Sequence, residues 1–430
     1  MAGRRFSWTV GLVLVLALAL RLGYVGLTPD YRIVHDARDY DAHARSIAAG
    51  EGFARLGPGP TRVTAFRPPG YPILLAGVYT LTGHETKPDE QRVVAGRVAN
   101  ALVGTAIVAL VGVLALQLFG RRVALVAMGL AAVYLPLILV GGALMSEPLF
   151  TGLLLGALTA AIAHRRSAHR LRWAVLAGVL GGLAILTRAN GMILLLPLAL
   201  AVWDARPRWS ALALAPPALL VAVAVLTVAP WTIRNAAVLH AFVPVSTQLG
   251  TSLAGTYNDV ARTDPEHPGA WRSLRRVPQT QYLTAPAPWR RTGEAHLERE
   301  LRAVALRYID DHPRYVATVA FWNTRRALDL AGLGWSRHTY STVSVAPGWA
   351  NTGVACFWLF GALALAGALT RAGRRTPLHV WLVPALLYLS VVFLAFETPR
   401  YRTGIDPFVV LLAAVALVTA RDALRRSRAQ

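Results

Sequence analysis

A cluster of acidic and imidazole side chains follows the first apolar segment of the chain. It reads His35-Asp36-Ala37-Arg38-Asp39-Tyr40-Asp41-Ala42-His43. A carboxylate in this cluster could act as a general base toward a hydroxyl group of a sugar or a lipid. The alternative is a solvated helix start, in which Asp36 is the N-cap and Asp39 complements the helix dipole. The residues alone leave both interpretations open.

A second acid, Glu147, begins a later apolar segment within Ser146-Glu147-Pro148. A lone glutamate at a helix start usually stabilises the helix dipole. If the helices pack, however, Glu147 and Asp36 share one depth and could line one cavity. Two such carboxylates could hold a base, a hydroxyl group or a divalent cation. The spacing of these acids and a histidine is not diagnostic of a metal site.

Arginines stand close to the ends of other apolar segments. One pair lies in Glu397-Thr398-Pro399-Arg400-Tyr401-Arg402, a short turn before the last segment. Guanidinium groups bind phosphate oxygens in pairs, so this turn predicts a phosphate contact at the bilayer surface. The alternative is an ion pair with Glu397 or Asp406. Two more candidates are Arg67, in Phe66-Arg67-Pro68-Pro69-Gly70, and Arg234, in Trp231-Thr232-Ile233-Arg234-Asn235, which could instead anchor the chain at the interface.

The composition defines the environment of these residues. The chain has 430 residues, of which 55% are hydrophobic and only 15% are charged. A soluble domain carries roughly 25% charged residues. Apolar blocks of roughly 17–25 residues are long enough to cross a bilayer as helices. These features exclude a soluble enzyme, a disordered chain and, with Cys356 as the single cysteine, a disulfide scaffold or a cysteine-based metal site.

We therefore predict an all-α polytopic membrane protein with about ten transmembrane helices. The predicted spans are 7–27, 95–118, 122–141, 148–163, 174–187, 190–203, 210–230, 350–370, 377–396 and 404–420. The short run 68–81 is predicted to dip into the outer leaflet. The fifth and sixth spans are separated by the break Thr187-Arg188-Ala189-Asn190-Gly191.

The net charge of +22 comes from arginine clusters beside the apolar blocks, which favours membrane topology over nucleic-acid binding. Ten spans place these clusters and both termini on one side, which the positive-inside rule predicts to be the cytoplasm. Of the acidic residues, only Asp204 and Asp422 fall there. The predicted organisation has three parts. Residues 1–230 form a membrane module that includes the first outer loop, 28–94. Residues 231–349 form a large outer loop with juxtamembrane helices at 294–309 and 315–330, and residues 350–430 form the C-terminal membrane helices.

The order of the polar motifs resembles that of the GT-C glycosyltransferases. Along the chain it runs Asp36-x-x-x-Tyr40, Arg67-Pro68-Pro69, Glu147 after the third span, Pro230-Trp231-x-x-Arg234-Asn235 and Pro399-Arg400-Tyr401-Arg402. It is most similar to the dolichyl-phosphate-mannose–protein mannosyltransferase-like group, glycosyltransferase family 39, which includes bacterial aminoarabinose transferases of lipid A. The resemblance covers nearly the whole chain. Each motif is weak alone, and their order and common sidedness carry the specificity.

The resemblance implies an inverting transfer of a sugar from a polyprenyl-phosphate donor, on the outer face of the plasma membrane. Asp36 would be the catalytic base, or would orient the acceptor, and Arg67 would contact the carrier phosphate. The other implied substrate-binding residues are Asp39, Tyr40, Glu147, Arg234, His240, Arg400, Tyr401 and Arg402. The chain departs from the group in lacking an acid directly after Asp36. It also stops soon after the last span, which leaves a protein, lipid or glycan acceptor open.

No Gly-rich phosphate loop is present, so no nucleotide cofactor is expected, and a divalent cation is left open. A transporter or flippase of lipid-linked sugars is the main alternative function. Transporters bind their substrates at mid-membrane through broken helices, often in inverted repeats. Here the candidate break at 187–191 is expected near the outer end, and no inverted repeat is visible. A non-catalytic scaffold would not explain why the polar motifs share one side.

Overall fold

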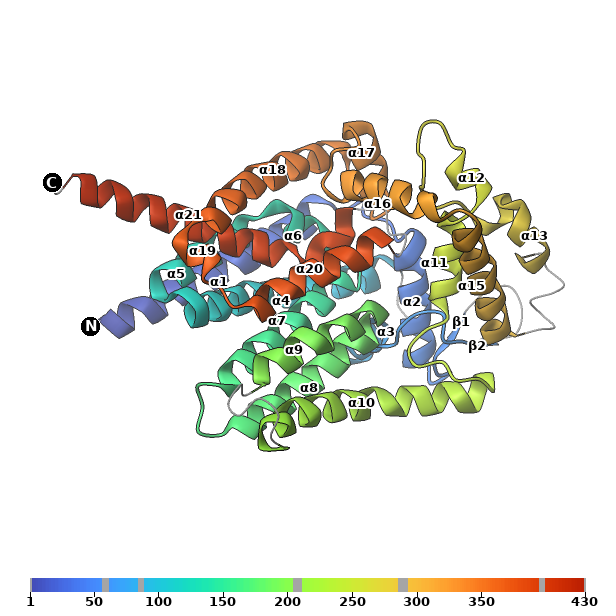
Figure 1. Cartoon of the computed structure of the whole chain (residues 1–430), viewed down its shortest axis with the longest axis horizontal. Helices are drawn as coiled ribbons and strands as arrows, with labels where there is room; N and C mark the ends of the chain where they lie inside the picture. Colours follow the sequence, from blue (N-terminus) through green and yellow to red (C-terminus); the bar gives the residue numbers. More distant parts are fainter. Residues whose placement is uncertain are drawn as a thin grey trace.

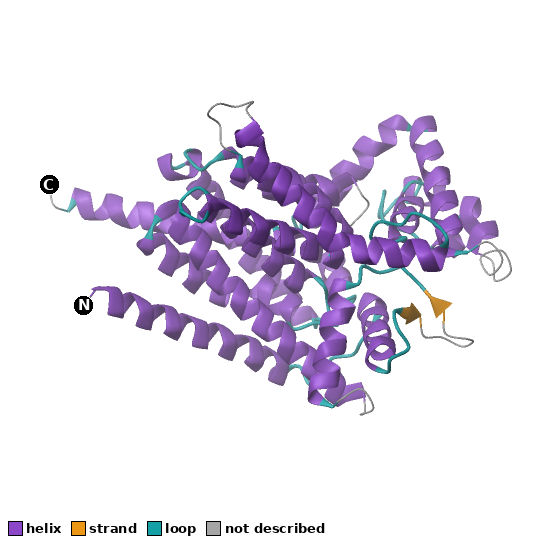
Figure 2. Ribbon diagram, turned by 90° about the horizontal axis from the view of Figure 1, so that it is seen from below, coloured by secondary structure: helices purple, strands orange, loops and turns teal. Residues whose placement is uncertain are grey.

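The computed structural model describes residues 2–55, 62–83, 89–203, 211–284, 293–393 and 399–428. Within these residues, seven helices are long and apolar enough to cross a membrane: α1 (Ala2–Leu27), α4 (Asp89–Phe119), α7 (Glu147–His164), α8 (Arg170–Thr187), α10 (Ala211–Leu239), α18 (Pro347–Leu369) and α21 (Asp406–Ser427). Figure 2 shows the long helices side by side in one bundle. The predicted all-α polytopic membrane fold is confirmed.

The remaining predicted spans are broken or short. The span predicted at 122–141 is a bent pair, α5 (Arg121–Val133) and α6 (Leu135–Gly141), which meet at 53°. The other two correspond to η1 (Ala189–Leu194) with α9 (Leu195–Val202), and to α20 (Leu378–Phe393). Both are shorter than the seven long helices. Each predicted span therefore has a helical counterpart in the structure, but these helices differ in length.

A buried arginine stabilises the bend between α5 and α6. Pro136 has no backbone N–H and Tyr134 is extended, so the carbonyl groups at the end of α5 lose their helical partners. Arg21 of α1 donates hydrogen bonds to the carbonyl oxygens of Ala131 and Ala132, both at 3.3 Å. A cation at a helix C-terminus is also favoured by the dipole. The bend turns the chain toward Glu147 at the start of α7.

The segment predicted to be the first outer loop, called the first outer segment below, forms a compact unit against the bundle. It contains α2 (His35–Ala48), the antiparallel strands β1 (Ala54–Arg55) and β2 (Arg62–Val63), and α3 (Gly70–Thr82). The predicted helix at 68–81 is thus present. Asp41 of α2 accepts hydrogen bonds from Arg92 of α4 at 2.8 and 3.0 Å and from Tyr79 of α3 at 2.9 Å. This buried network fixes α2 on α3 and α4, and with it the acidic cluster.

The second outer segment packs around its own apolar cluster, which includes Tyr257, Leu301 and Tyr315. The predicted helices at 294–309 and 315–330 are confirmed as α15 (Glu294–Asp311) and α16 (Pro313–Ala327). The other elements of this segment are α11 (Gln248–Thr256), α12 (Asp259–Arg262), η2 (Leu274–Arg276), α13 (Pro278–Thr284) and α17 (Leu333–Ser341). Two short elements, α19 (Arg371–Arg374) and η3 (Pro399–Gly404), connect the last long helices.

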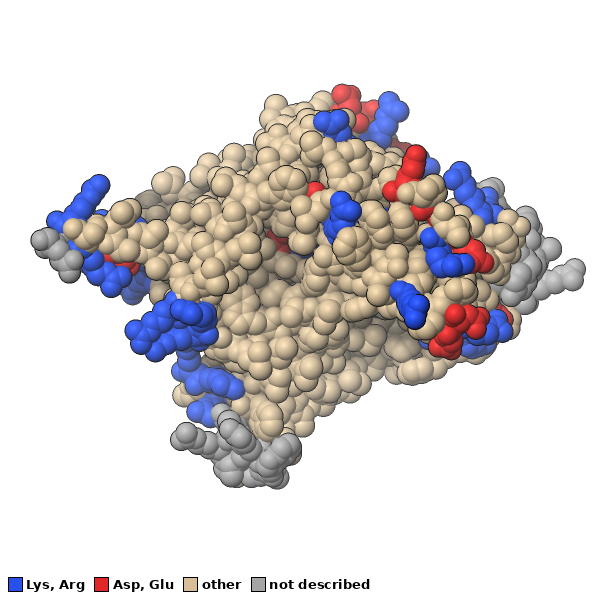
Figure 3. Space-filling view, turned by 45° about the horizontal axis from the view of Figure 1, so that its top comes forward, with Lys and Arg blue, Asp and Glu red and all other residues tan. Residues whose placement is uncertain are grey.

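Both termini lie at one end of the bundle, and α2, α3 and the helices from α11 to α17 lie at the other (Figure 1). Basic side chains gather at the end with the termini, and both signs of charge occur at the opposite end (Figure 3). Asp204 and Glu397, which entered the sequence predictions, lie outside the described residues. The assignment of the arginine-rich end to the cytoplasm stays a prediction from the positive-inside rule.

Candidate active site

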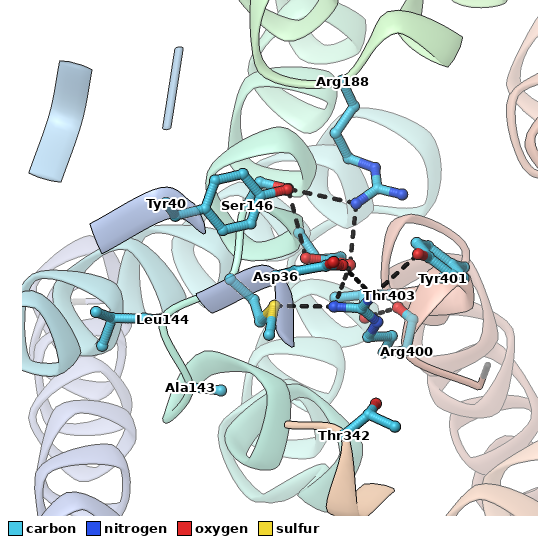
Figure 4. A network of polar contacts seen from close by, with 12 residues as sticks. Asp36, Tyr40, Ala143, Leu144, Ser146, Arg188, Thr342, Arg400, Tyr401 and Thr403 are labelled. Atoms are coloured by element: carbon cyan, nitrogen blue, oxygen red, sulfur yellow. Dashed lines mark hydrogen bonds and ion pairs between the residues drawn. The ribbon is translucent and has the colours of Figure 1, made fainter. Parts of the chain in front are cut away.

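The carboxylate of Asp36 is held between two arginines from distant parts of the chain. Its Oδ1 accepts a hydrogen bond from Nη2 of Arg67 at 2.6 Å, and its Oδ2 accepts one from Nη2 of Arg400. Asp36 lies in the first turn of α2, but the N-cap is Val34 and no side chain caps the helix. The N-cap interpretation of Asp36 therefore does not apply. Figure 4 shows Asp36 of α2 beside Arg400 of η3. Arg67 reaches the same carboxylate from the segment before α3.

These contacts set the ionisation of the cluster. Burial alone would raise the pKa of Asp36, but the guanidinium groups of Arg67 and Arg400 hold it well below its ordinary value. Asp36 is therefore a carboxylate at neutral pH, and 21% of its side chain stays exposed. Burial raises the pKa of the neighbouring Tyr40 to about 12, so its phenol is neutral. Asp39 completes the pairing of Arg67, with Oδ2 at 3.1 Å from Nε and 2.8 Å from Nη2.

Glu147 belongs to the same network. Its Oε1 lies 2.9 Å from Nη1 of Arg188 and 3.7 Å from Nη1 of Arg400. Ser146 connects α2 with the Arg188 segment, because its Oγ lies 3.1 Å from the hydroxyl of Tyr40 and accepts a hydrogen bond from Arg188 at 3.3 Å. The structure thus brings Asp36 and Glu147 to one place, as their common depth predicted.

A cavity of about 460 Å³ opens beside this network. The network contributes a polar wall, the 192–193 turn and the 242–249 segment contribute apolar side chains, and α15 contributes a charged rim. The polar wall consists of Asp36, Tyr40, Arg67, Arg188 and Tyr401. The apolar side chains are Met192, Ile193, Phe242, Val243, Val245 and Leu249. The charged rim consists of Glu298, Arg299 and Arg302. Such a cavity can hold a ligand with one anionic end and one hydrocarbon part.

Two contacts position Arg67 at this cavity. Glu294, at the start of α15, accepts hydrogen bonds from the hydroxyl of Thr64 at 2.5 Å and from the backbone of Ala65 at 2.9 Å. Gly70 permits the close approach of α3 to α8, because a Cβ atom there would lie 2.6 Å from Oγ1 of Thr187. The Arg67 segment is therefore held from both the outer segment and the membrane bundle.

Three predicted site residues lie elsewhere. Arg402 does not line the cavity, because its Nη1 donates to Asp329 at 2.6 Å and its Nε lies 3.4 Å from Asp406. The alternative of an ion pair with Asp406 thus describes Arg402, and Arg400 is the arginine that meets Asp36. Arg234 donates to the carbonyl oxygens of Thr64 at 2.7 Å and Phe53 at 2.9 Å, and so supports the Arg67 segment from behind. His240 is exposed at the end of α10 and lies outside the cavity lining.

The sequence prediction did not include Arg188, Arg299 or Arg302 among the site residues, although all three line the cavity. For Arg188 a signal was available. It stands at the break between two apolar helices, at the end of the bundle that is predicted to be the outer one, where the positive-inside rule disfavours arginine. Arg299 and Arg302 carry no comparable signal, because charged residues are ordinary on an amphipathic helix outside the membrane.

The residues at the cavity do not fit a divalent cation. The acids Asp36 and Glu147 already pair with guanidinium groups, and those groups would repel a cation. No histidine of the described ranges lines the cavity. Among the described residues, no group of three or more His, Cys, Asp or Glu side chains is arranged to hold a metal ion.

Comparisons with known proteins agree with this architecture. Residues 67–233 match the family described as Dolichyl-phosphate-mannose-protein mannosyltransferase. No curated protein sequence matches the chain. The fold is similar to that of AglB, an archaeal oligosaccharyltransferase from Archaeoglobus fulgidus, solved with an inhibitory peptide and a dolichol-phosphate. The TM-score is 0.56 at 15% identity, over 99% of this chain and 51% of that chain.

A second structure of the A. fulgidus enzyme, tethered with an acceptor peptide, gives a TM-score of 0.57 at 15% identity, over 99% of this chain and 50% of that one. ArnT from Cupriavidus metallidurans, bound to undecaprenyl phosphate, gives a TM-score of 0.46 at 16% identity, over 97% and 78% of the two chains. The chain spans about half the length of the archaeal enzyme. The fold is of the GT-C type, and the resemblance to this group is confirmed by the matched segment and the architecture.

Proposed function

We propose that the chain is an integral-membrane glycosyltransferase, which moves a sugar from a polyprenyl-phosphate donor to an acceptor hydroxyl group. The observation that carries this proposal is the Asp36 carboxylate, held between Arg67 and Arg400 at the wall of a partly apolar cavity. The donor carries a phosphate and a hydrocarbon chain, and the guanidinium groups and the apolar side chains of the cavity are their chemical counterparts. The similarity of residues 67–233 to the mannosyltransferase family supports the same reaction class.

The proposed reaction is a single displacement at the anomeric carbon. The acceptor oxygen forms a bond to that carbon while the bond from the carbon to the phosphate oxygen breaks. The hydroxyl proton passes to the Asp36 carboxylate, and the bonding electrons leave with the polyprenyl phosphate. Attack opposite to the leaving group inverts the anomeric centre. The arginines at the cavity stabilise the charge that develops on the departing phosphate.

Donor binding would also prepare the base. Both oxygens of Asp36 accept hydrogen bonds from guanidinium groups in the structure, which makes the carboxylate a weak base. A phosphate that enters the network adds negative charge and competes for Arg67 and Arg400. Both effects raise the affinity of Asp36 for a proton. Asp36 therefore becomes a stronger base when the sugar donor is present.

Location and partners follow from the same proposal. With the arginine-rich end in the cytoplasm, the Asp36 network lies at the outer face of the plasma membrane. There the chain would meet polyprenyl-phosphate sugars and the lipid, glycan or protein acceptors of the cell envelope.

The direct test is transfer by the purified full chain in proteoliposomes. A radiolabelled polyprenyl-phosphate sugar and cell-envelope acceptors are supplied, and label in the acceptor is measured. Wild type is expected to transfer label, and Asp36→Asn is expected to lose it. Asp259→Asn is the matched control, because Asp259 on α12 is half-exposed and pairs with Arg262, and neither residue lines the cavity. Movement of intact donor across the bilayer without transfer would instead identify a flippase.

A further inference from the structure

Arg188 is the arginine of the network that stands on irregular backbone. The helix α8 ends at Thr187, η1 begins at Ala189, and Arg188 between them is extended, with φ −148° and ψ 122°. Non-helical backbone between membrane helices is tolerated where it is buried in protein or lines a cavity. Arg188 does line the cavity, and 14% of its side chain is exposed.

Its partners leave part of the guanidinium group available. The two polar contacts of Arg188, to Glu147 at 2.9 Å and to Ser146 at 3.3 Å, both use Nη1. The ring of Tyr401 covers it at 4.8 Å from the ring centroid. Within the part of the chain that the structure describes, no polar contact uses its Nη2, and Figure 4 draws none. Arg67, by contrast, uses both Nε and Nη2 on Asp36 and Asp39.

The surroundings of Arg188 indicate which anion fits. Met192 and Ile193 follow it in η1 and line the same cavity, and Met192 is 50% exposed. Phe242, from the segment after α10, also lines the cavity and is 80% exposed. An inorganic anion would make no contact with these apolar side chains, whereas a phosphate with a hydrocarbon chain would cover them.

We propose that Arg188 is the primary ligand of the donor phosphate, and that Met192, Ile193 and Phe242 contact the first isoprene units of the same lipid. This inference rests on the proposed function and names a binding residue for it. Nε and Nη2 of Arg188, which make no polar contact with any described residue, match two phosphate oxygens. Glu147 and Tyr401 hold this guanidinium group in place, so the phosphate arrives next to the Asp36 network.

The test is binding of undecaprenyl phosphate to the full chain in lipid nanodiscs, measured by native mass spectrometry or by fluorescence titration. Arg188→Gln is expected to weaken binding roughly tenfold to a hundredfold, the range of a hydrogen bond to a charged group. Arg188→Lys is expected to recover part of the affinity, because it keeps the charge but not the two-pronged geometry. Arg262→Gln, on the exposed α12, is the matched control and is expected to bind like wild type.

Arg188→Gln leaves Glu147 buried without its main partner, which could prevent folding. The double variant Arg188→Gln with Glu147→Gln removes both charges and tests the same loss of binding. Unchanged affinity in a folded Arg188→Gln or double variant would overturn the inference. So would a comparable loss in Arg299→Gln with none in Arg188→Gln, which would place the phosphate on α15.

Competition with inorganic phosphate tests whether the site prefers a lipid-linked phosphate to the free anion. Inorganic phosphate is expected to compete with undecaprenyl phosphate only at far higher concentration, and equal competition would refute the role of the apolar wall. Failure of the proposed function has a different signature. If Arg188→Gln loses lipid binding as expected but the wild type transfers no sugar, the Arg188 site stands and the transferase proposal fails.

Discussion

Replacement of Asp36 by asparagine is expected to remove catalysis without weakening donor binding. The variant loses the proton acceptor, and a positioned general base contributes roughly 10²–10⁴ to the rate. This loss corresponds to about 3–5 kcal/mol in the activation free energy. The asparagine oxygen can keep one of the two guanidinium contacts of Asp36, and the second arginine is released. The released group can bind phosphate, so the donor Kd should stay equal or fall by up to roughly tenfold.

The assay measures both quantities on one preparation. Initial rates of label transfer give kcat, and titration with undecaprenyl phosphate in nanodiscs gives the Kd. Asp39→Asn is the matched control, because Asp39 pairs with Arg67 and its side chain is 29% exposed. The rate of this variant should fall less than about tenfold. A rate near wild type in Asp36→Asn would refute the role of Asp36 as base. A large loss of donor binding would show that the carboxylate only holds the arginines.

Three further predictions concern the supports of the site and its ionisation. Arg402→Leu leaves the fully buried carboxylate of Asp329 without its guanidinium partner. It should lower the free energy of unfolding in detergent by about 3–5 kcal/mol. The double variant Arg402→Leu with Asp329→Asn should restore most of that loss. Arg21→Met leaves carbonyl groups at the α5–α6 bend without donors and should cost about 1–3 kcal/mol in the same measurement; a stability equal to wild type would contradict its capping role. Arg67 and Arg400 outweigh burial and keep the pKa of Asp36 low. Asp36 therefore stays ionised at pH values below the ordinary aspartate pKa of about 3.9. The acid limb of kcat/KM should therefore lie below about pH 4, and a limb near pH 6 would argue against Asp36 as the titrating group.

The membrane helices were predictable because apolar length is a local property of the sequence. The predicted spans 95–118 and 350–370 correspond to α4 and α18 within a few residues. The bend in the third span was not predicted, although Pro136 marks it. It depends on a donor from another helix, Arg21, and the sequence does not show which helices are neighbours. Whether the short helix α20 crosses the whole bilayer stays a prediction.

The choice between Arg400 and Arg402 could not be made from the sequence. Both stand in one short turn, and the same chemistry applies to each. In η3, a 3-10 helix with three residues per turn, side chains two positions apart point in different directions. Arg400 therefore reaches Asp36, whereas Arg402 reaches Asp329 in the outer segment. The partner Asp329 is more than seventy residues away in sequence, and only the tertiary fold reveals it.

The most direct measurement is a structure of the full chain in lipid nanodiscs with undecaprenyl phosphate bound. Phosphate oxygens should lie about 2.7–2.9 Å from guanidinium nitrogens of Arg188, with the isoprene chain along Met192 and Phe242. At least one of the two contacts between Asp36 and its arginines should be broken. A phosphate bound away from this network, with both contacts of Asp36 intact, would contradict the proposed site and the reaction assigned to it.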